Sequence, residues 1–578
     1  MNLRALLEQR LTAALANAGI SGSPAMVRIA GKPEFGDYQA NGVMGAAKRN
    51  QQNPRALAES CVANADVEGL ATLSLAGPGF INIQLAPSWL SQALNNAPHP
   101  LTPVADPQTV VVDFSSPNLA KEMHVGHIRS TIIGDAIART LEALGHKVIR
   151  QNHVGDWGTQ FGMLITYLTE QQGAADEDND NDKDEQLADI EEFYRAAKAR
   201  FDADEAFADR SRQAVVDLQR GDAEIRGQWQ RFINMSLDHC QATYDRLGTT
   251  LTRADVMPES AYNDDLPNIV QQLEEQGLIE ESDGAKCVFL DEFKGKDGSR
   301  LPVIVQKSDG GYLYATTDLA ALKYRCHSLK ADRILVFTDA RQVFHFRQFL
   351  AVGKLAGFST AATSIEHMPF GAMLGTDGKP FKTRAGGVIR LNDLLDEAIA
   401  RAAKQATDMG SLTEPKALAH AANVIGIGAV KYADLSKNRT SDYVFDWDAM
   451  LALDGNTAPY MQYAYARVQS LFRRAGISQE QAHALQVGEL VDVSEQRLAV
   501  ALLRLQEVSE QMAAEGMPHY LCTYLYELAN LFMRFYENCP ILKAPADVRD
   551  SRLALCAHMA SVVQTGLNLL GIDTLEQM

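Results

Sequence analysis

The segment from Val110 to His127 limits the fold more than any other part of the chain. It starts as an apolar run, continues as a short polar loop, and ends in His124-Val-Gly-His127 where a helical pattern begins. The unpaired N–H groups and the dipole of a helix N-terminus attract anions. The two histidines lie on one helical face, and Gly126 lets a flat base or a ribose approach the backbone. The segment therefore predicts a site that binds phosphate oxygens as negative charge grows on them.

The chain around this segment has the pattern of an α/β domain. Residues 109–114 lack polar alternation, as expected for a parallel strand covered on both faces, and residues 128–144 have helical periodicity. Further apolar strands are predicted at 147–152 and 333–339, with a helical insertion at about 160–250 between them. Ligands bind at the carboxyl ends of strands in such sheets, which favours a phosphate site over a pair of surface or capping histidines. The polar residues at these ends are His124, His127, Asn152, His153 and residues 339–342.

The rest of the chain divides into two further domains. Residues 1–105 alternate helical patterns with short strands, and the polar, proline-containing stretch at 95–107 is typical of a linker. From about residue 392 the chain shows Ala/Leu periodicity without strand runs, which indicates a separate helical domain. We therefore expect an α+β domain at 1–105, an α/β domain at 106–391 and an all-α domain at 392–578.

Charge and cysteine content exclude some classes of protein. The net charge of −19 does not exclude a nucleic-acid partner, because binding depends on local basic surface. Much of the negative excess lies in residues 176–185, interpreted as a solvated loop because the glycine and register of an EF-hand metal site are missing. The seven cysteines are odd in number and never spaced as C-x-x-C, which argues against disulfides and zinc and favours core positions. No apolar stretch is long enough for a membrane helix and the N-terminal helix is unlike a secretory signal, so we expect a cytoplasmic protein.

A second candidate for phosphate binding is the stretch from Met373 to Gly387. It carries Lys379, Lys382 and Arg384 among four glycines, which suits a mobile cationic loop that closes over a polyphosphate. A solvated hairpin is the alternative. The paired histidines upstream favour the cationic loop.

These stretches resemble a known family. His124-Val-Gly-His127 is similar to the HIGH signature of class I aminoacyl-tRNA synthetases, and Lys379-Pro-Phe-Lys-Thr383 stands in the place of their KMSKS loop. Residues 116–123, 155–160, 314–318 and 454–463 resemble motifs of bacterial arginyl-tRNA synthetases, and the similarity runs over essentially the whole chain. It implies a Rossmann-type parallel-sheet catalytic domain, an N-terminal module that binds the tRNA elbow and a helical-bundle domain that binds the anticodon. The implied reaction is ATP-dependent ligation of L-arginine to its tRNA through an adenylate.

The resemblance also assigns a site for the amino acid. The implied residues are Asn118, Glu259, Tyr314, Asp318 and Gln342. Their types fit a guanidinium, which is planar, always charged and needs carboxylates and a neutral acceptor. Asp318 has the alternative role of a helix N-cap, and both roles can hold.

The loop departs from the family pattern at its second cation. Either Lys382 or Arg384 can take that part. The resemblance suggests that the family has relaxed the loop and uses a lysine just before the signature instead, which here is Lys121. The predicted catalytic residues are Lys121, His124, Gly126, His127 and Lys382. The predicted ATP-binding residues are His124, His127, Lys379, Lys382 and Arg384.

Two regions resemble tRNA contacts. In the N-terminal domain these are Phe80 and Asn82, and in the helical domain Tyr460, Tyr463 and Arg467, where stacking faces lie beside a charge. Aromatic residues at helical spacing are often core residues, which is the alternative for each tyrosine. The stretch from Lys431 to Arg439 mixes cations with polar groups and is a further candidate.

The predicted ligands are ATP with accompanying Mg²⁺ and no dedicated protein metal site, L-arginine and the tRNA for arginine. We expect a monomer with no membrane contact; the resemblance suggests that activation waits for tRNA. A small-molecule nucleotidyltransferase also uses His-x-Gly-His, but the long helical domain argues against it. A non-catalytic tRNA-binding paralogue is disfavoured by the intact signature and loop lysines.

Overall fold

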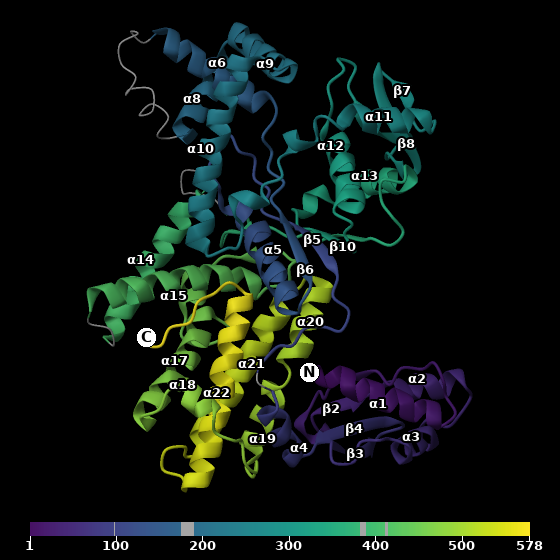
Figure 1. Ribbon diagram of the computed structural model, residues 1–578, viewed down its shortest axis with the longest axis vertical. Helices are drawn as coiled ribbons and strands as arrows, with labels where there is room; N and C mark the ends of the chain where they lie inside the picture. The colour runs from purple at the N-terminus through teal and green to yellow at the C-terminus, as the bar shows by residue number, and fades with distance from the viewer. Residues whose placement is uncertain (98, 175–189, 382–388, 411–413) are drawn as a thin grey trace.

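The computed structural model describes residues 1–97, 99–174, 190–381, 389–410 and 414–578. Figure 1 shows a central parallel sheet with two groups of elements above it, a bundle of helices below it, and the N-terminal domain projecting beside the bundle. This is the arrangement of an α/β domain with an N-terminal α+β domain and a C-terminal helical domain. The predicted fold class is therefore confirmed. The acidic stretch at 176–185 lies outside the described residues.

The central sheet has the order β11-β10-β5-β6, and its strands pair in parallel. Helix α5 (Val125–Ala143) connects β5 to β6 as the predicted βαβ unit, and Val110, Val111 and Val112 are fully buried. The strands are β5 (Thr109–Asp113), β6 (Lys147–Gln151), β10 (Arg333–Val336) and β11 (Ser364–His367). Strand β11 was not predicted, because its residues Ser-Ile-Glu-His carry no apolar run.

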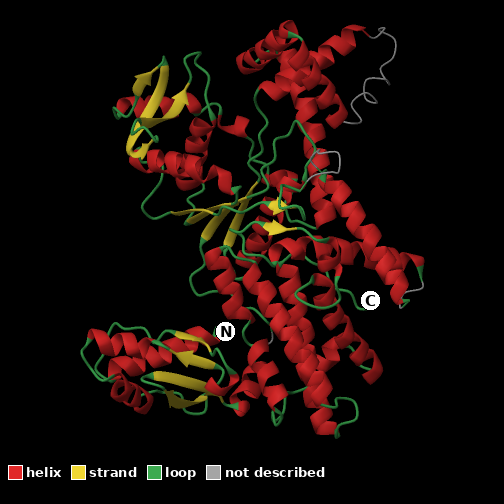
Figure 2. Cartoon of the chain, turned by 180° about the vertical axis from the view of Figure 1, so that it is seen from behind, coloured by secondary structure: helices red, strands yellow, loops and turns green. Residues whose placement is uncertain are grey.

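Two insertions stand above the carboxyl ends of the sheet (Figures 1 and 2). The first is the predicted helical one, with α6 (Thr159–Ala174), α8 (Ile190–Ala203), α9 (Glu205–Arg220) and α10 (Ala223–Leu247). The second was not predicted: α11 (Leu266–Glu275) precedes an antiparallel sheet of β7 (Glu280–Ser282), β8 (Ala285–Lys294) and β9 (Arg300–Gln306). Helix α12 (Tyr314–Lys323) leads from it back to β10, and α13 (Val343–Leu355) connects β10 to β11. Short helical turns are η2 (Arg253–Asp255), η3 (Glu259–Tyr262), η4 (Tyr324–Ser328) and η5 (Ala340–Gln342).

The N-terminal domain packs helices against one face of an antiparallel sheet of order β1-β2-β4-β3. Its helices are α1 (Leu3–Asn17), α2 (Gly42–Arg49), α3 (Pro54–Ala63) and α4 (Pro87–Asn95), with the turn η1 (Pro33–Phe35). Its strands are β1 (Val27–Ile29), β2 (Tyr38–Ala40), β3 (Ala71–Ala76) and β4 (Phe80–Leu85). The buried Tyr38 hydroxyl donates to a carboxylate oxygen of Glu507 at 3.0 Å, which ties this domain to the C-terminal helical domain.

The described residues of the C-terminal part form helices and one short strand. Strand β13 (Tyr443–Val444) pairs in parallel with β12 (Met373–Leu374), so the prediction that no strand follows residue 392 is wrong. The pairing was missed because two residues give no periodicity. The helices are α14 (Leu391–Met409), α15 (Pro415–Leu435), α16 (Trp447–Leu451), α17 (Ala458–Ala475), α18 (Gln479–His483), α19 (Val493–Leu502), α20 (Leu505–Glu515), α21 (His519–Asn538) and α22 (Ala546–Leu569). Helices α14, α15, α20 and α22 contact α5.

The cysteines are buried with free thiols, as their spacing predicts. The described part of the chain contains no helix with the length and hydropathy that a membrane-spanning segment needs.

Candidate active site

A cavity of about 870 Å³ opens at the carboxyl ends of the central strands. Most of the predicted nucleotide and amino-acid residues line it, although they come from segments up to 224 positions apart, from Asn118 to Gln342. The lining residues among those predicted are Asn118, His124, Gly126, His127, Glu259, Tyr314, Asp318 and Gln342. His153 and Asp339, which the sequence places at the carboxyl ends of strands, also line it, and so do Ser116 and His345, to which the sequence assigned no role.

The two signature histidines form a reciprocal cap at the N-terminus of α5. His124 is the N-cap residue, and its Nδ1 accepts the N–H of Gly126 at 3.0 Å. The Nδ1 of His127 accepts the N–H of His124 at 3.1 Å, and the two rings lie 3.9 Å apart. The capping alternative therefore holds in part, because the rings both cap the helix and face the cavity.

These bonds fix where the rings can carry a proton. Burial lowers the pKa of His124, with Lys121 adding to the effect, and burial together with His124 lowers the pKa of His127 to about 3. Both rings are neutral near neutral pH, and since each Nδ1 accepts a backbone N–H, each Nε2 carries the proton. The pair therefore offers N–H donors, which suit phosphate oxygens.

Gly126 has a local role besides the approach of a base or ribose. A Cβ at this position would lie 2.8 Å from Cε1 and 2.9 Å from Nδ1 of His124. A larger residue would displace the imidazole that caps the helix. The glycine therefore preserves the position of the neighbouring histidine.

Two carboxyl groups face the opposite part of the cavity. Burial raises the pKa of Glu259 to about 8, and the nearby carboxylates of Asp156 and Asp318 add to the shift. The backbone of η3, which begins at Glu259, is held by Asp156, whose Oδ1 and Oδ2 accept from the N–H and hydroxyl of Ser260 at 2.9 and 2.5 Å. Mutual repulsion of buried carboxylates is relieved when a cation binds between them.

Asp318 lies within a helix rather than at its start. Helix α12 begins at Tyr314 with Leu313 as N-cap residue, so the alternative of Asp318 as an N-cap is wrong. The Oδ2 of Asp318 accepts a hydrogen bond from Nε2 of His345 at 2.6 Å. No role for His345 was predicted from the sequence, although it stands three residues after Gln342, a spacing that places both on one helical face.

The remaining predicted amino-acid residues stand at the rim. Tyr314 is 65% exposed, and burial of its hydroxyl end, with Glu259, raises its pKa. Gln342 is the N-cap residue of α13 and is exposed. Asn118 packs against the backbone of Gly155, where a Cβ would lie 2.1 Å from the Asn118 Oδ1.

The predicted cations are placed differently. Neither Lys121 nor Lys379 is among the described residues that line the cavity. The Lys121 ammonium lies over the ring of Tyr194, 4.6 Å from its centroid. Lys379 is exposed in a turn, and its carbonyl oxygen accepts a hydrogen bond from the N–H of Gly375. Lys382 and Arg384 lie outside the described residues, so the choice between them stays open.

Comparisons with known proteins cover the whole of this architecture. Residues 90–447 match the family model described as "tRNA synthetases class I (R), catalytic domain". Residues 3–85 match an arginyl tRNA synthetase N-terminal domain, and residues 461–578 match a DALR anticodon binding domain. The chain is 56% identical to the arginine–tRNA ligase of Hahella chejuensis, and the match covers 100% of both chains. The chain belongs to the arginyl-tRNA synthetase family.

Other relatives agree with this assignment. The arginine–tRNA ligase of Cellvibrio japonicus is 54% identical, again with 100% of both chains covered. Among solved structures, an arginyl-tRNA synthetase from Plasmodium falciparum matches with a TM-score of 0.83 and 27% identity over 100% of both chains. That of Thermus thermophilus has the same TM-score at 23% identity and 100% coverage, which supports the fold.

The residues that the resemblance to arginyl-tRNA synthetases assigned to tRNA lie on two surfaces away from the cavity. Phe80 and Asn82 point to the same side of β4, opposite to the buried Ile81 and Ile83, and Asn82 accepts from the Gln39 amide at 2.8 Å. In α17, Tyr460, Tyr463 and Arg467 are half-buried on one face; the last packs over the Tyr536 ring at 4.4 Å.

Two cations of one candidate tRNA stretch, Lys431 and Arg439, are internal. Lys431 is fully buried and donates to the carbonyls of Leu247 and Gly571 at 2.7 and 2.5 Å. Arg439 is 4% exposed and donates to the carbonyls of Pro369 and Gly516. The interpretation of these two cations as tRNA contacts is wrong, because carbonyls from distant segments already hold them.

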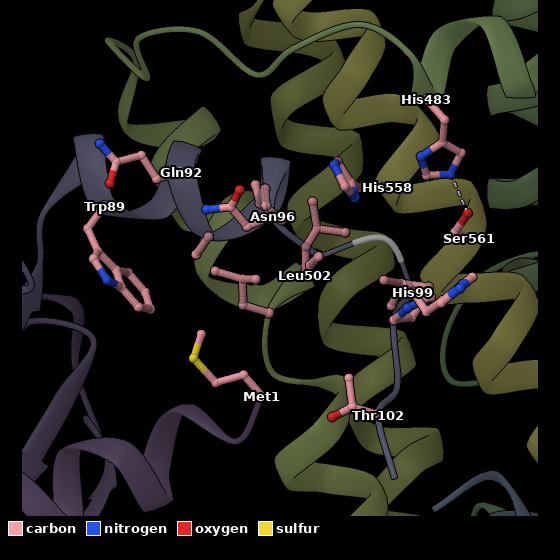
Figure 3. A pocket seen from close by; sticks show the side chains of 16 residues that line it. Met1, Trp89, Gln92, Asn96, His99, Thr102, His483, Leu502, His558 and Ser561 are labelled. Carbon is pink, nitrogen blue, oxygen red and sulfur yellow. Dashed lines mark hydrogen bonds between the residues drawn. The ribbon is translucent and has the colours of Figure 1, made fainter.

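A second, smaller cavity of about 350 Å³ lies where α4 and the segment after it meet the helical domain (Figure 3). In Figure 3, Met1 and Trp89 stand opposite His483 and His558, and the His483 Nε2 is hydrogen-bonded to Ser561 at 2.5 Å. Burial lowers the pKa of His558 to about 4, with His483 adding to the shift. This cavity belongs to a domain junction and is separate from the candidate active site.

Proposed function

We propose that the chain ligates L-arginine to its cognate tRNA in an ATP-dependent reaction through arginyl-adenylate, with release of pyrophosphate and AMP. The observation that carries this proposal is one cavity with neutral histidine donors at one end and two carboxyl groups at the other. The first set suits a polyphosphate and the second suits a guanidinium. Family membership supports the same reaction.

The arginine end selects its substrate by charge and shape. Asp318, oriented by His345, offers a carboxylate oxygen to the guanidinium, and Glu259 loses its proton when that cation enters. Gln342 supplies a neutral acceptor, and Tyr314 packs along the side-chain stem. A neutral isostere such as citrulline would leave the carboxylates without a cation and bind weakly.

The phosphate end stabilises the charge that develops when the arginine carboxylate attacks the α-phosphate. The Nε2–H groups of His124 and His127 donate to phosphate oxygens, and the N-terminus of α5 adds its dipole. Positioning and electrostatics carry this step, and the protein contributes no nucleophile. Lys121 and Lys379, which are not among the residues lining the cavity, would supply further positive charge, and the part of Lys382 or Arg384 stays a prediction.

Mg²⁺ fits this site as a companion of ATP. The side chains that face the phosphates are imidazole N–H donors, whereas Mg²⁺ prefers oxygen ligands and keeps several waters. Phosphate oxygens would therefore hold it, and when bound it would neutralise part of the triphosphate charge.

The tRNA would span three parts of the molecule. Phe80 and Asn82 would contact its elbow, Tyr460, Tyr463 and Arg467 its anticodon arm, and the terminal ribose would enter the cavity. The three-domain division at residues 105 and 391, a monomeric state and a cytoplasmic location stay predictions.

An ATP–pyrophosphate exchange assay with each amino acid, run with and without tRNA, tests the proposal. We expect that arginine supports exchange when tRNA is present and that no other amino acid does. Exchange without any amino acid would favour a small-molecule nucleotidyltransferase, and tRNA binding without exchange or charging would favour a non-catalytic paralogue.

A further inference from the structure

The histidines of the cavity carry their protons on different nitrogens. In His124 and His127 the Nδ1 accepts a backbone N–H, so the Nε2 is the donor. The Nδ1 of His153 instead lies 3.1 Å from the carbonyl oxygen of Met257. A carbonyl oxygen can only accept, so the Nδ1 of His153 carries a proton, and the Nε2 is the nitrogen left to act as an acceptor. Of these three lining histidines, two therefore offer a donor and one offers an acceptor.

His153 stands beside the loop that leads to the signature. It follows β6, and its backbone N–H donates to Ser116 Oγ at 3.1 Å. Ser116 lies in the loop between β5 and α5, and its hydroxyl donates to Asp113 at 2.9 Å. The ring meets Tyr262 edge-on, with centroids 5.7 Å apart. In the described part of the chain no hydrogen bond reaches the Nε2 of His153, although the residue lines the cavity.

The proposed reaction defines which substrate group comes to this place. The carboxylate of the amino acid must reach the phosphate held near His124 and His127, while the guanidinium lies near Glu259 and Asp318. The α-ammonium is bonded to the same carbon as the carboxylate, so it lies toward the phosphate end. An ammonium group has three donors and no acceptor, and it needs acceptors around it.

We infer that the Nε2 of His153 accepts a hydrogen bond from the α-ammonium group of the amino acid. This inference rests on the proposed function, because it places arginine in the cavity. It gives His153 two separate tasks on its two nitrogens. The Nδ1–H anchors the ring to the segment that carries Glu259, and the Nε2 contacts the substrate.

Two amide substitutions separate these tasks. In His153→Asn the amide N–H₂ can take the place of Nδ1 and keep the bond to Met257, but nothing replaces the Nε2. In His153→Gln the amide oxygen can reach the place of Nε2, while the anchor is lost. His153→Asn therefore removes the substrate contact and keeps the structural contact, whereas His153→Gln keeps the substrate contact and removes the structural one.

The experiment measures the dissociation constants of three ligands for the full-length chain by titration calorimetry. The ligands are L-arginine, agmatine, which lacks the carboxylate, and guanidinopentanoate, which lacks the amino group. We expect His153→Asn to weaken arginine and agmatine by about 10-fold or more and to leave guanidinopentanoate within about twofold, because a hydrogen bond to a charged group is lost. His153→Gln should keep the preference for the two ligands that carry an amino group.

Equal weakening of all three ligands by His153→Asn would overturn the inference, as would unchanged binding of all three. The failure of the proposed function looks different. In that case the parent chain itself would bind arginine no better than citrulline, whatever residue stands at position 153.

Discussion

The two ends of the cavity are built in contrasting ways. The phosphate end is local: His124, Gly126 and His127 come from one turn of α5 and hold each other in place. The arginine end is assembled from η3, α12 and the start of α13, which are distant in the sequence. The pKa shifts also have opposite consequences. Burial leaves the histidines as neutral donors, whereas burial and repulsion keep Glu259 largely protonated until a cation arrives.

Because of this difference, the two ends contribute to different measurable quantities, the rate of the chemical step and the affinity for arginine. The phosphate end is preorganised before the substrate binds, so its effect appears in the rate of the chemical step. The arginine end changes its charge on binding, so its effect appears in affinity and in its pH dependence. The first three predictions below each perturb one end, and the last one perturbs neither.

The largest effect is expected at the phosphate end. His127→Ala should slow adenylate formation by about 100-fold or more, because a donor to the developing charge is lost, and should leave arginine affinity nearly unchanged. Pre-steady-state measurement of arginine-dependent ATP consumption checks this. The exposed His420→Ala is the matched control. A His127→Ala variant that reacts at the parent rate would show that His127 does not stabilise the developing charge.

The next effect concerns Asp318. Asp318→Asn should raise the KM for arginine by about 30-fold or more and spare that for ATP, because the guanidinium loses a carboxylate in a partly desolvated site. Steady-state exchange kinetics measure both constants, with the exposed Asp297→Asn as control. If arginine and citrulline compete as they do in the parent, Asp318 has only a structural role.

A smaller effect follows from Glu259. Its pKa is about 8 in the empty site and must fall when the guanidinium binds, so arginine affinity rises with pH and levels off above pH 8. The ionised fraction predicts a gain of about fivefold between pH 7 and pH 8. Calorimetric titrations at several pH values should also show proton release on binding. Glu259→Gln should flatten the profile, and an equally steep profile in that variant would assign the proton to another group.

The smallest effect lies outside both ends. Arg467→Ala should weaken tRNA binding a few-fold and reduce the salt slope of log K by about one, while the KM values for arginine and ATP stay the same. Filter binding across a salt series measures it, with Arg300→Ala, whose guanidinium pairs with Glu280, as control. An unchanged slope would mean that Arg467 only packs on Tyr536.

The contrast also explains what the sequence could predict. Contiguous features were accessible: the strand–loop–helix order, the histidine pair and the helical insertion all produce local patterns. Asp318 was placed at a helix start because the true N-cap, Leu313, provides no side-chain hydrogen bond and hence no signal. The β7–β9 sheet was missed because β7 is short, β8 is rich in charge, and a proline interrupts the apolar run of β9.

Long-range partners were the main source of error. Lys431 and Arg439 have the sequence context of surface cations, and only the fold brings carbonyls from distant segments to them. His345 gained its role in the same way, through a contact with Asp318 across two helices. Burial and partner identity are properties of the assembled chain, so a single sequence does not reveal them.

The most direct test of this division is ATP–pyrophosphate exchange with tRNA present, measured for the parent, His127→Ala, Asp318→Asn and the double variant. Two ends that act on opposite charges without sharing partners should give additive free-energy losses. We predict exchange with arginine alone in the parent, and in the double variant a loss of kcat/KM equal to the product of the two single losses. Exchange supported equally by another amino acid, or a double variant no slower than His127→Ala, would contradict it.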